Sequence, residues 1–123
     1  MKDESTQPQD LKVRTKDFAL RIICLYASLP KTTEAQIIGK QVLRSGTSAG
    51  AQYREGHRAK SDADVINKFE SVLQELDETA YWLELLVESG IVTEAKLQPL
   101  MKETDELIAI FVAIVTKIKR RRK

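Results

Sequence analysis

The chain has 123 residues, of which 42% are hydrophobic and 31% are charged, a balance typical of one folded domain rather than a disordered segment. Its single cysteine excludes an internal disulfide and fits a reducing compartment, and its single histidine excludes a zinc site of the usual His and Cys ligands. The longest apolar run, residues 107–115, is too short to span a membrane, and the polar first ten residues do not resemble a secretory signal. Five glycines and three prolines are too few for the turns of an all-β domain of this size. We therefore expect a cytoplasmic helical protein.

The net charge of +2 hides a strong segregation of charge along the sequence. Residues 62–90 carry one lysine against eight acids, whereas residues 1–61 carry 11 basic residues against six acids. Residues 91–123 are basic again, with eight Lys and Arg residues against four acids. Such asymmetry bears on partners and on the packing of neighbouring segments more than on the fold.

The N-terminal third of the sequence predicts an arm followed by a helix. Residues 1–13 are polar without a sustained period and predict a mobile arm. From Phe18 to Leu29 apolar residues recur at steps of four, three and four, which predicts one face of a helix, with Ile23 and Tyr26 widening it. The proline that follows Leu29 ends this helix, because it disfavours the α conformation in the residue before it.

A second helix is expected from Thr33, whose hydroxyl can cap it while Gln36 reaches back in a capping box, to about His57. Small residues dominate its inner face, which comprises Gly39, Val42, Gly46, Ala49, Tyr53 and Gly56. Because each glycine costs a helix about 1 kcal/mol relative to alanine, three on one face indicate that another backbone approaches closely there. A kink or break within residues 45–50 is the alternative.

The third and fourth predicted helices have the clearest pattern, with inner residues alternating at steps of three and four. Ser61 and Asp64 form a capping box at the start of the third helix, which ends at Ser89 and Gly90. Its seam comprises Ile66, Phe69, Leu73, Leu76, Ala80, Leu83 and Val87. Thr93 caps the fourth helix, whose seam comprises Leu97, Leu100, Thr104, Leu107, Phe111, Ile114 and Ile118.

Four amphipathic helices joined by short connections predict an all-α fold, an antiparallel up-down-up-down four-helix bundle. We divide the chain into a flexible N-terminal arm at residues 1–13, the bundle at residues 14–119 and a basic C-terminal tail at residues 120–123. No strand and no internal repeat is expected.

Some apolar side chains lie outside these seams. Trp82 and Leu85 project away from the inner face of the third helix, and Ile110 and Val112 make the fourth helix apolar nearly all round. A helix with two apolar faces usually lies between two partners, of which the bundle itself supplies one. We therefore expect a homo-oligomer with these four residues at its interface. The alternative is that the N-terminal arm covers them or that they are singly exposed.

No catalytic or cofactor constellation is recognisable in the sequence. A di-iron bundle needs Glu-x-x-His pairs on two helices, whereas the only histidine, His57, lies near the end of the second predicted helix and suits the surface or the helix dipole. Cys24 lies beside the inner face of the first helix and is expected to be buried and inert. We therefore predict a non-enzymatic protein without a metal site or cofactor.

Two groups of basic residues remain as candidate nucleic-acid-binding sites. The first recurs on one face of the second helix and comprises Lys40, Arg44, Arg54 and Arg58. Pairing with acids of the third helix is the alternative for each of them. The second group is the C-terminal run of Lys117, Lys119, Arg120, Arg121, Arg122 and Lys123. This run exceeds what a helix dipole needs and would bind phosphate backbones without reading bases, whereas the alternative is a role in solubility alone.

The stretch from residue 18 to residue 92 resembles the four-helix bundle proteins encoded within intervening sequences of 23S rRNA genes. The resemblance rests on QVLRS at residues 41–45, Ser48, Glu55-Gly56, SDADVI at residues 61–66, ELDETAYWLELL at residues 75–86 and SGIV at residues 89–92. The family often shows a Ser-x-Pro-x-Asn-x-Ala-Glu-Gly run. This chain departs from that run at Gly50, Gln52 and Arg54.

The resemblance implies a small non-enzymatic bundle, and members of that family assemble as ring-like pentamers. The family is similar in turn to the accessory proteins of diversity-generating retroelements, which engage a reverse transcriptase and nucleic acid. These relations imply an oligomeric scaffold, a pentamer by family analogy, for RNA or DNA or for a nucleoprotein partner, away from membranes. The alternative is a bundle that binds only another protein, through Trp82 and Leu85.

Overall fold

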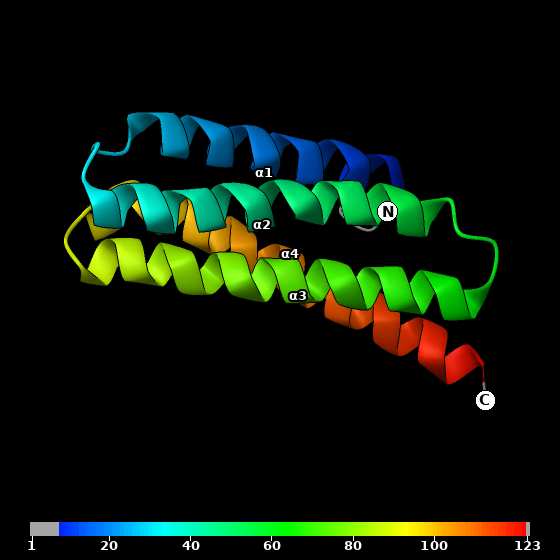
Figure 1. Cartoon of the computed structure of the whole chain (residues 1–123). Helices are drawn as coiled ribbons and strands as arrows, with labels where there is room; N and C mark the ends of the chain where they lie inside the picture. Colours follow the sequence, from blue (N-terminus) through cyan, green and yellow to red (C-terminus); the bar gives the residue numbers. More distant parts are fainter. Residues whose placement is uncertain (1–7, 123) are drawn as a thin grey trace.

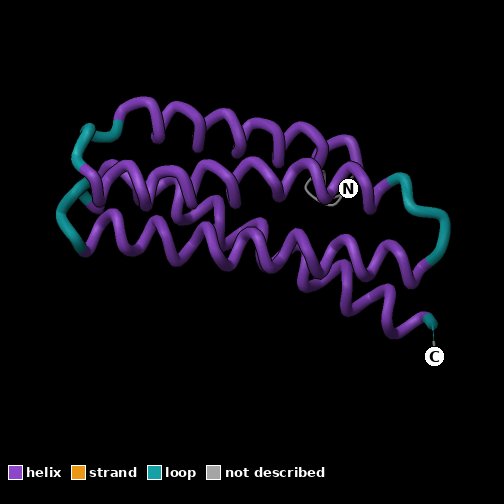
Figure 2. Tube along the Cα trace, viewed as in Figure 1, coloured by secondary structure: helices purple, strands orange, loops and turns teal. Residues whose placement is uncertain are grey.

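The computed structural model describes residues 8–122, which form an antiparallel four-helix bundle (Figure 1). The helices are α1 (Pro8–Ser28), α2 (Thr33–His57), α3 (Asp62–Glu88) and α4 (Glu94–Arg121). Helices that follow one another along the chain pack side by side, and short loops join them at alternate ends of the bundle (Figure 2). The predicted fold class is therefore confirmed.

The helix caps follow the predicted pattern with one shift. Ser61 and Thr93 cap α3 and α4, their hydroxyls accepting hydrogen bonds from backbone N–H groups in the first turn. α2 is capped by Thr32 rather than by Thr33, and no capping box forms there. The Gln36 amide instead donates to the Pro30 carbonyl at 2.8 Å and accepts from the Tyr26 hydroxyl at 2.9 Å. Gln36 therefore ties the α1–α2 connection to the end of α1.

The predicted division into arm, bundle and tail needs correction at the N-terminus. α1 begins at Pro8, because a proline at the first helical position gives up no hydrogen bond. Leu11 is only 2% exposed and packs into the core, so residues 8–13 belong to the bundle rather than to an arm. At the other end α4 continues to Arg121, into the predicted tail. Residues 1–7 and 123 lie outside the described residues.

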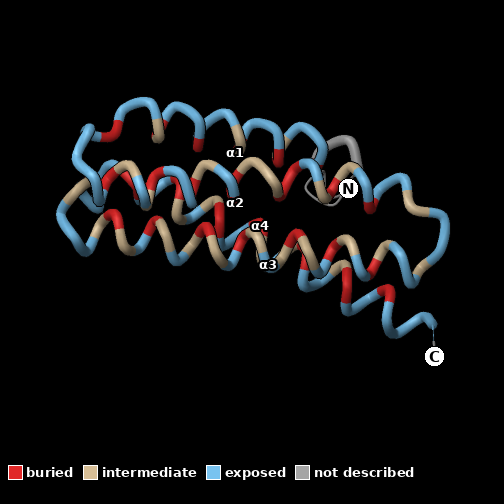
Figure 3. The backbone as a smooth tube through the Cα atoms, in the orientation of Figure 1, coloured by how far each residue is buried: buried red, intermediate tan, exposed pale blue. Residues whose placement is uncertain are grey.

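The core runs along the inner faces of all four helices (Figure 3). All six predicted inner residues of α2 are buried, as are the four of the first predicted helix, and Val115 replaces Ile114 on α4. On α3 the buried line passes instead through Val72, Thr79 and Leu86, one residue before the predicted positions. A straight helix drifts against a seven-residue repeat, and α3 packs against both α2 and α4, so its most buried line points between its two neighbours.

The small residues of α2 make room for side chains rather than for another backbone. A methyl group added at Gly46 would lie 2.7 Å from Ile22 Cγ1 of α1, and one added at Gly56 would lie 2.6 Å from Phe69 Cε1 of α3. The prediction that another backbone approaches this face is therefore wrong at these positions, because the close contacts come from large side chains. α2 is continuous from residue 33 to residue 57, so no break occurs near residues 45–50.

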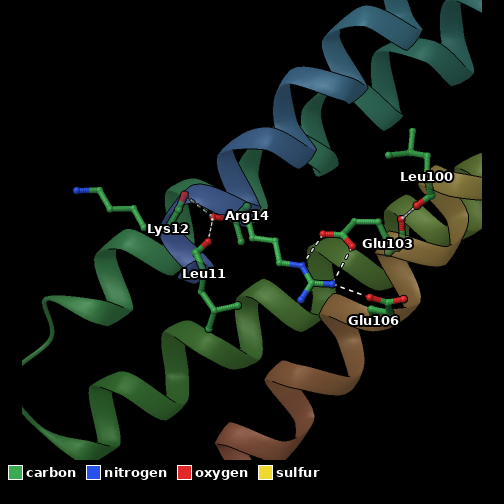
Figure 4. Close-up of polar contacts among 8 residues, drawn as sticks. Leu11, Lys12, Arg14, Leu100, Glu103 and Glu106 are labelled. Carbon is green, nitrogen blue, oxygen red and sulfur yellow. Dashed lines mark hydrogen bonds and ion pairs between the residues drawn. The ribbon is translucent and has the colours of Figure 1, made fainter. Parts of the chain in front are cut away.

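One ion cluster joins α1 to α4, which pack less closely than helices that follow one another along the chain. The Arg14 guanidinium donates through Nε and Nη2 to both carboxylate oxygens of Glu103, each at 2.8 Å, and Nη2 also donates to Glu106 at 2.7 Å (Figure 4). The hydrogen bond to Glu103 is the main cause that raises the pKa of Arg14 above its ordinary value. This fork-shaped contact fixes where α4 crosses α1.

Candidate nucleic-acid interface

The antiparallel topology brings the C-terminal ends of α2 and α4 to the same end of the bundle (Figure 1). Arg54 lies in the last turn of α2 and Arg58 caps its C-terminus, and residues 117–121 of the basic run form the last turns of α4. Lys40 lies near the opposite end of α2. The two predicted basic groups therefore meet only in part, and we call the end where they meet the basic end.

Several predicted cations are held in ion pairs with α3. Arg44 pairs with Glu75 at 3.2 Å and with Glu78, and the hydrogen bond to Glu78 is the main cause that raises the pKa of Arg44. Arg44 therefore follows the alternative given in the sequence analysis, pairing with acids of the third helix. Lys119 pairs with Glu70 at 2.7 Å and Arg121 with Asp62 at 3.3 Å, so half of the eight acids of α3 are matched by cations.

Other cations at the basic end have no ion pair with any residue that the structure describes. Of the predicted residues these are Arg54, Arg58, Lys117, Arg120 and Arg122. Lys123 lies outside the described residues. Lys12, Lys16 and Lys60 add three exposed cations at this end that were not predicted. The first two lie on α1, whose start had been read as an arm, and Lys60 lies in the loop between α2 and α3.

An apolar cavity of about 750 Å³ opens at the basic end. Its floor includes Tyr53 and Phe69, whose rings stack with centroids 5.7 Å apart, and His57 stacks on the other side of Tyr53 at the same distance. His57, Lys117 and Arg121 are exposed residues that line it. No aromatic residue interleaves with the basic run in the sequence, and Tyr53 and His57 lie near it only because of the fold.

The residues predicted for an oligomer interface are covered to different degrees. Trp82 and Ile110 are partly buried against the core of their own chain, Leu85 is also partly buried, and Val112 is 48% exposed. Trp82 Nε1 is buried and has no hydrogen-bond acceptor among the described residues.

An exposed apolar stripe on α1 was not predicted. It consists of Val13, Leu20 and Ile23, which are 58%, 50% and 45% exposed. Ile23 had been assigned to the inner face, but the buried line of α1 runs through Phe18, Ile22 and Leu25 and leaves it outside. The sequence does contain a pattern for this stripe, because Val13 and Leu20 are seven residues apart and therefore lie on the same face of a helix.

Of the other two chemistry-bearing residues, His57 lines the cavity at the basic end and Cys24 does not. Cys24 is exposed, so the prediction of a buried thiol is wrong, because its position on α1 falls next to Ile23 on the outer face. His57 lies at the C-terminal end of α2 as expected. Across the described residues no group of three or more His, Cys, Asp or Glu side chains could hold a metal ion. No helix among them is long and apolar enough to cross a membrane.

The fold and the basic end define an all-α antiparallel bundle with unpaired positive charge at one end. Within this class, the profile described as "23S rRNA-intervening sequence protein" matches residues 9–113, and the chain belongs to that family. The match includes most of α4, beyond the stretch on which the sequence resemblance rested.

A solved structure supports the same assignment. It is the 1.70 Å crystal structure of a protein with unknown function from the S23 ribosomal protein family of Bacteroides thetaiotaomicron VPI-5482. The two sequences are 37% identical, and the match covers 89% of this chain and 97% of the other with a TM-score of 0.83. A search of functionally curated proteins gives no match.

Proposed function

We propose that this protein is a non-enzymatic, homo-oligomeric scaffold of the cytoplasm that binds RNA or DNA through the basic end of its bundle. The observation that carries the proposal is the set of cations there that remain without an acidic partner among the described residues, after α3 has paired with Arg44, Lys119 and Arg121. Cations that stay unpaired on the surface are available to phosphates, and each phosphate contact releases bound counterions.

One comparison supports nucleic acid as the polyanion, since the solved relative is assigned to a ribosomal protein family. The exposed cations of the basic end come from the start of α1, the α2–α3 loop and the C-terminal ends of α2 and α4, so they are spread over several elements. The proposed binding is therefore to the phosphate backbone, without strong sequence preference.

The homo-oligomer is inferred from apolar surface that remains exposed on a single chain. Val112 of α4 and the α1 stripe of Val13, Leu20 and Ile23 are about half exposed. A pentamer is the expected assembly by family analogy. Light scattering at tens of micromolar should return a multiple of the 13.9 kDa chain mass, and the monomer mass alone would contradict this part of the proposal.

Nucleic-acid binding is tested with two triple variants of equal charge change. The first, Arg58→Gln with Arg120→Gln and Arg122→Gln, removes unpaired cations from the basic end. The matched control, Lys31→Gln with Lys40→Gln and Lys96→Gln, removes exposed cations near the opposite end. We expect only the first to weaken binding of a fluorescein-labelled RNA in anisotropy titrations. Equal weakening by both would contradict a localised site.

A protein-docking role is the second candidate, and the exposed α1 stripe favours it. The two functions separate in a pull-down from native cell extract with and without nuclease. Loss of all partners after nuclease treatment supports the scaffold for nucleic acid. A protein partner that is retained after nuclease and lost in Leu20→Asp supports docking on α1.

A further inference from the structure

The C-terminal half of α3 presents an exposed acidic face that nothing in the described chain neutralises. Asp77, Tyr81, Glu84 and Glu88 recur at steps of four, three and four and are all exposed, Tyr81 by 52%. None of the three acids has an ion pair with a described residue. The Tyr81 ring rests against Trp82 with centroids 5.0 Å apart, which holds it at the surface.

A matching face lies on the C-terminal half of α4. Ala109, Ala113, Lys117 and Arg121 follow one another at steps of four and all line the cavity of about 750 Å³. The two alanines leave space beside the aliphatic side chains of Ile110 and Ile114, and the two cations stand at one end of this face. Arg121 uses one guanidinium nitrogen on Asp62 at 3.3 Å and keeps further donors for another acid.

The two faces cannot meet within one chain. α3 and α4 are antiparallel, so Glu84 and Glu88 lie at the opposite end of the bundle from Lys117 and Arg121. α3 has 27 residues, which at 1.5 Å per residue is a length of about 40 Å. Contact between the two faces therefore requires two molecules.

We propose that the cavity on α4 receives the acidic face of α3 from a second copy of this chain. The Tyr81 ring packs over the alanines, and Glu84 and Glu88, four residues apart, pair with Lys117 and Arg121, which have the same spacing. The proposal rests on the homo-oligomer proposed above and names one contact within it. This contact uses Lys117 and leaves Arg54, Arg58, Arg120 and Arg122 for nucleic acid. Because the receiving and inserted surfaces differ, each copy can bind one neighbour through α4 and another through α3. Such a contact closes into a ring when the rotation between neighbouring copies allows it.

The lining favours this occupant over the others. A phosphate backbone would use the cations but not the aliphatic lining, which accounts for most of the cavity wall. A small anionic amphiphile would fill the cavity but would leave the acidic face of α3 uncovered. A second copy satisfies both surfaces at once, and electrostatic complementarity of this kind fixes orientation and partner choice.

The test uses charge reversal in the full-length chain. One variant carries Lys117→Glu with Arg121→Glu, and the other carries Glu84→Lys with Glu88→Lys. We expect each variant alone to sediment mainly as monomer where the wild type assembles. A chain that carries all four reversals should assemble again, because its reversed α4 face then matches the reversed α3 face of the next copy in a ring of any size. A control, Lys96→Glu with Lys102→Glu, reverses exposed cations in the N-terminal half of α4 and should assemble like the wild type. Circular dichroism confirms that each variant is folded.

The outcomes separate this inference from the proposed function. If the wild type assembles and both reversals assemble equally well, the oligomer stands and this interface is wrong. If each reversal is monomeric and the chain that carries all four reversals stays monomeric as well, the two faces do not contact each other and the inference also fails. If the wild type is itself monomeric, the proposed homo-oligomer fails as well. A monomer that retains a small ligand in native mass spectrometry would assign the cavity to that ligand instead.

Discussion

At the scale of single residues, Gly46 shows most clearly how side-chain volume is shared between helices. A methyl group at this position would lie 2.7 Å from Ile22 Cγ1, and Ile22 is a fully buried, β-branched residue that has little freedom to move. The glycine is therefore required by the packing of α1 on α2, although glycine is a poor helix former.

Gly46→Leu is expected to destabilise the protein. Overpacking of a core costs about 1–3 kcal/mol and sometimes more, whereas replacing a helical glycine returns only about 1 kcal/mol. We expect urea unfolding to show a net loss of stability, and sedimentation to show altered assembly where the bundle distorts. Ala51→Leu, at an exposed position of the same helix, is the control and should change stability little. A Gly46→Leu variant that is more stable and identically assembled would show that this face is open.

Arg14 joins α1 to α4 through charge-assisted hydrogen bonds, and its side chain and that of Glu103 are 21% and 17% exposed. Hydrogen bonds to charged groups contribute roughly 1.5–3 kcal/mol, so Arg14→Ala should lower the free energy of unfolding by about that amount. Arg21→Ala, on the exposed side of α1, should have a much smaller effect. The coupling energy from a double-mutant cycle with Glu103→Ala measures the contact itself, and a value near zero would show that it does not stabilise the bundle.

Tyr53 makes stability depend on pH in the alkaline range. Burial raises the pKa of the Tyr53 hydroxyl above its ordinary value of about 10. As the pH rises through about 10, the phenol ionises first in the unfolded chain, so the free energy of unfolding falls by up to about 1.4 kcal/mol per pH unit. Tyr53→Phe should remove this part of the slope in urea unfolding between pH 9 and about pH 11. Tyr81→Phe, on the exposed face of α3, is the control, and equal slopes in wild type and Tyr53→Phe would contradict the prediction.

Among single residues, the sequence predicted those whose role depends on local spacing. The caps at Ser61 and Thr93 are confirmed because a cap is defined by residues within one turn. The Arg14–Glu103 contact joins residues 89 positions apart, and no local pattern indicates it. The burial of Cys24 was predicted wrongly because the predicted inner face of α1 included one residue too many, Ile23, next to Cys24.

At the scale of helices, hydrophobic periodicity predicted the number and direction of the four helices and the inner face of α2 correctly. It could not fix the rotation of α3, because the buried line of a helix that lies between two others depends on both neighbours. It also missed the first turn of α1, since only the folded bundle gives Leu11 something to pack against.

The last turn of α4 is expected to contribute to binding rather than to folding. Removal of residues 119–123 takes away the ion pairs of Lys119 with Glu70 and of Arg121 with Asp62, which are exposed, and exposed pairs contribute about 0–1 kcal/mol. We expect the thermal midpoint to change little while affinity for RNA falls clearly in anisotropy titrations. If the affinity for RNA is unchanged after this removal, the basic run has a role in solubility alone.

At the scale of the whole molecule, the fold converts a sequence with alternating charged segments into a bundle with one basic end. The sequence identified the basic residues of α2 and α4, but only the topology shows that Arg58 and Lys117 lie at the same end and that Lys40 does not. The cavity beside them could not be predicted, because it exists only where α4 crosses away from α1 next to Tyr53.

The salt dependence of RNA binding tests the central claim most directly. For the wild-type protein, the logarithm of affinity should fall linearly with the logarithm of salt concentration, by about 0.7–0.9 for each phosphate contact. For the variant that carries Arg58→Gln, Arg120→Gln and Arg122→Gln, the magnitude of this slope should be smaller by roughly two to three, because the variant lacks three cations that face phosphates. The control with Lys31→Gln, Lys40→Gln and Lys96→Gln should keep the wild-type slope. A wild-type protein that binds no RNA at low salt, or a slope that the basic-end variant leaves unchanged, would contradict the proposed function.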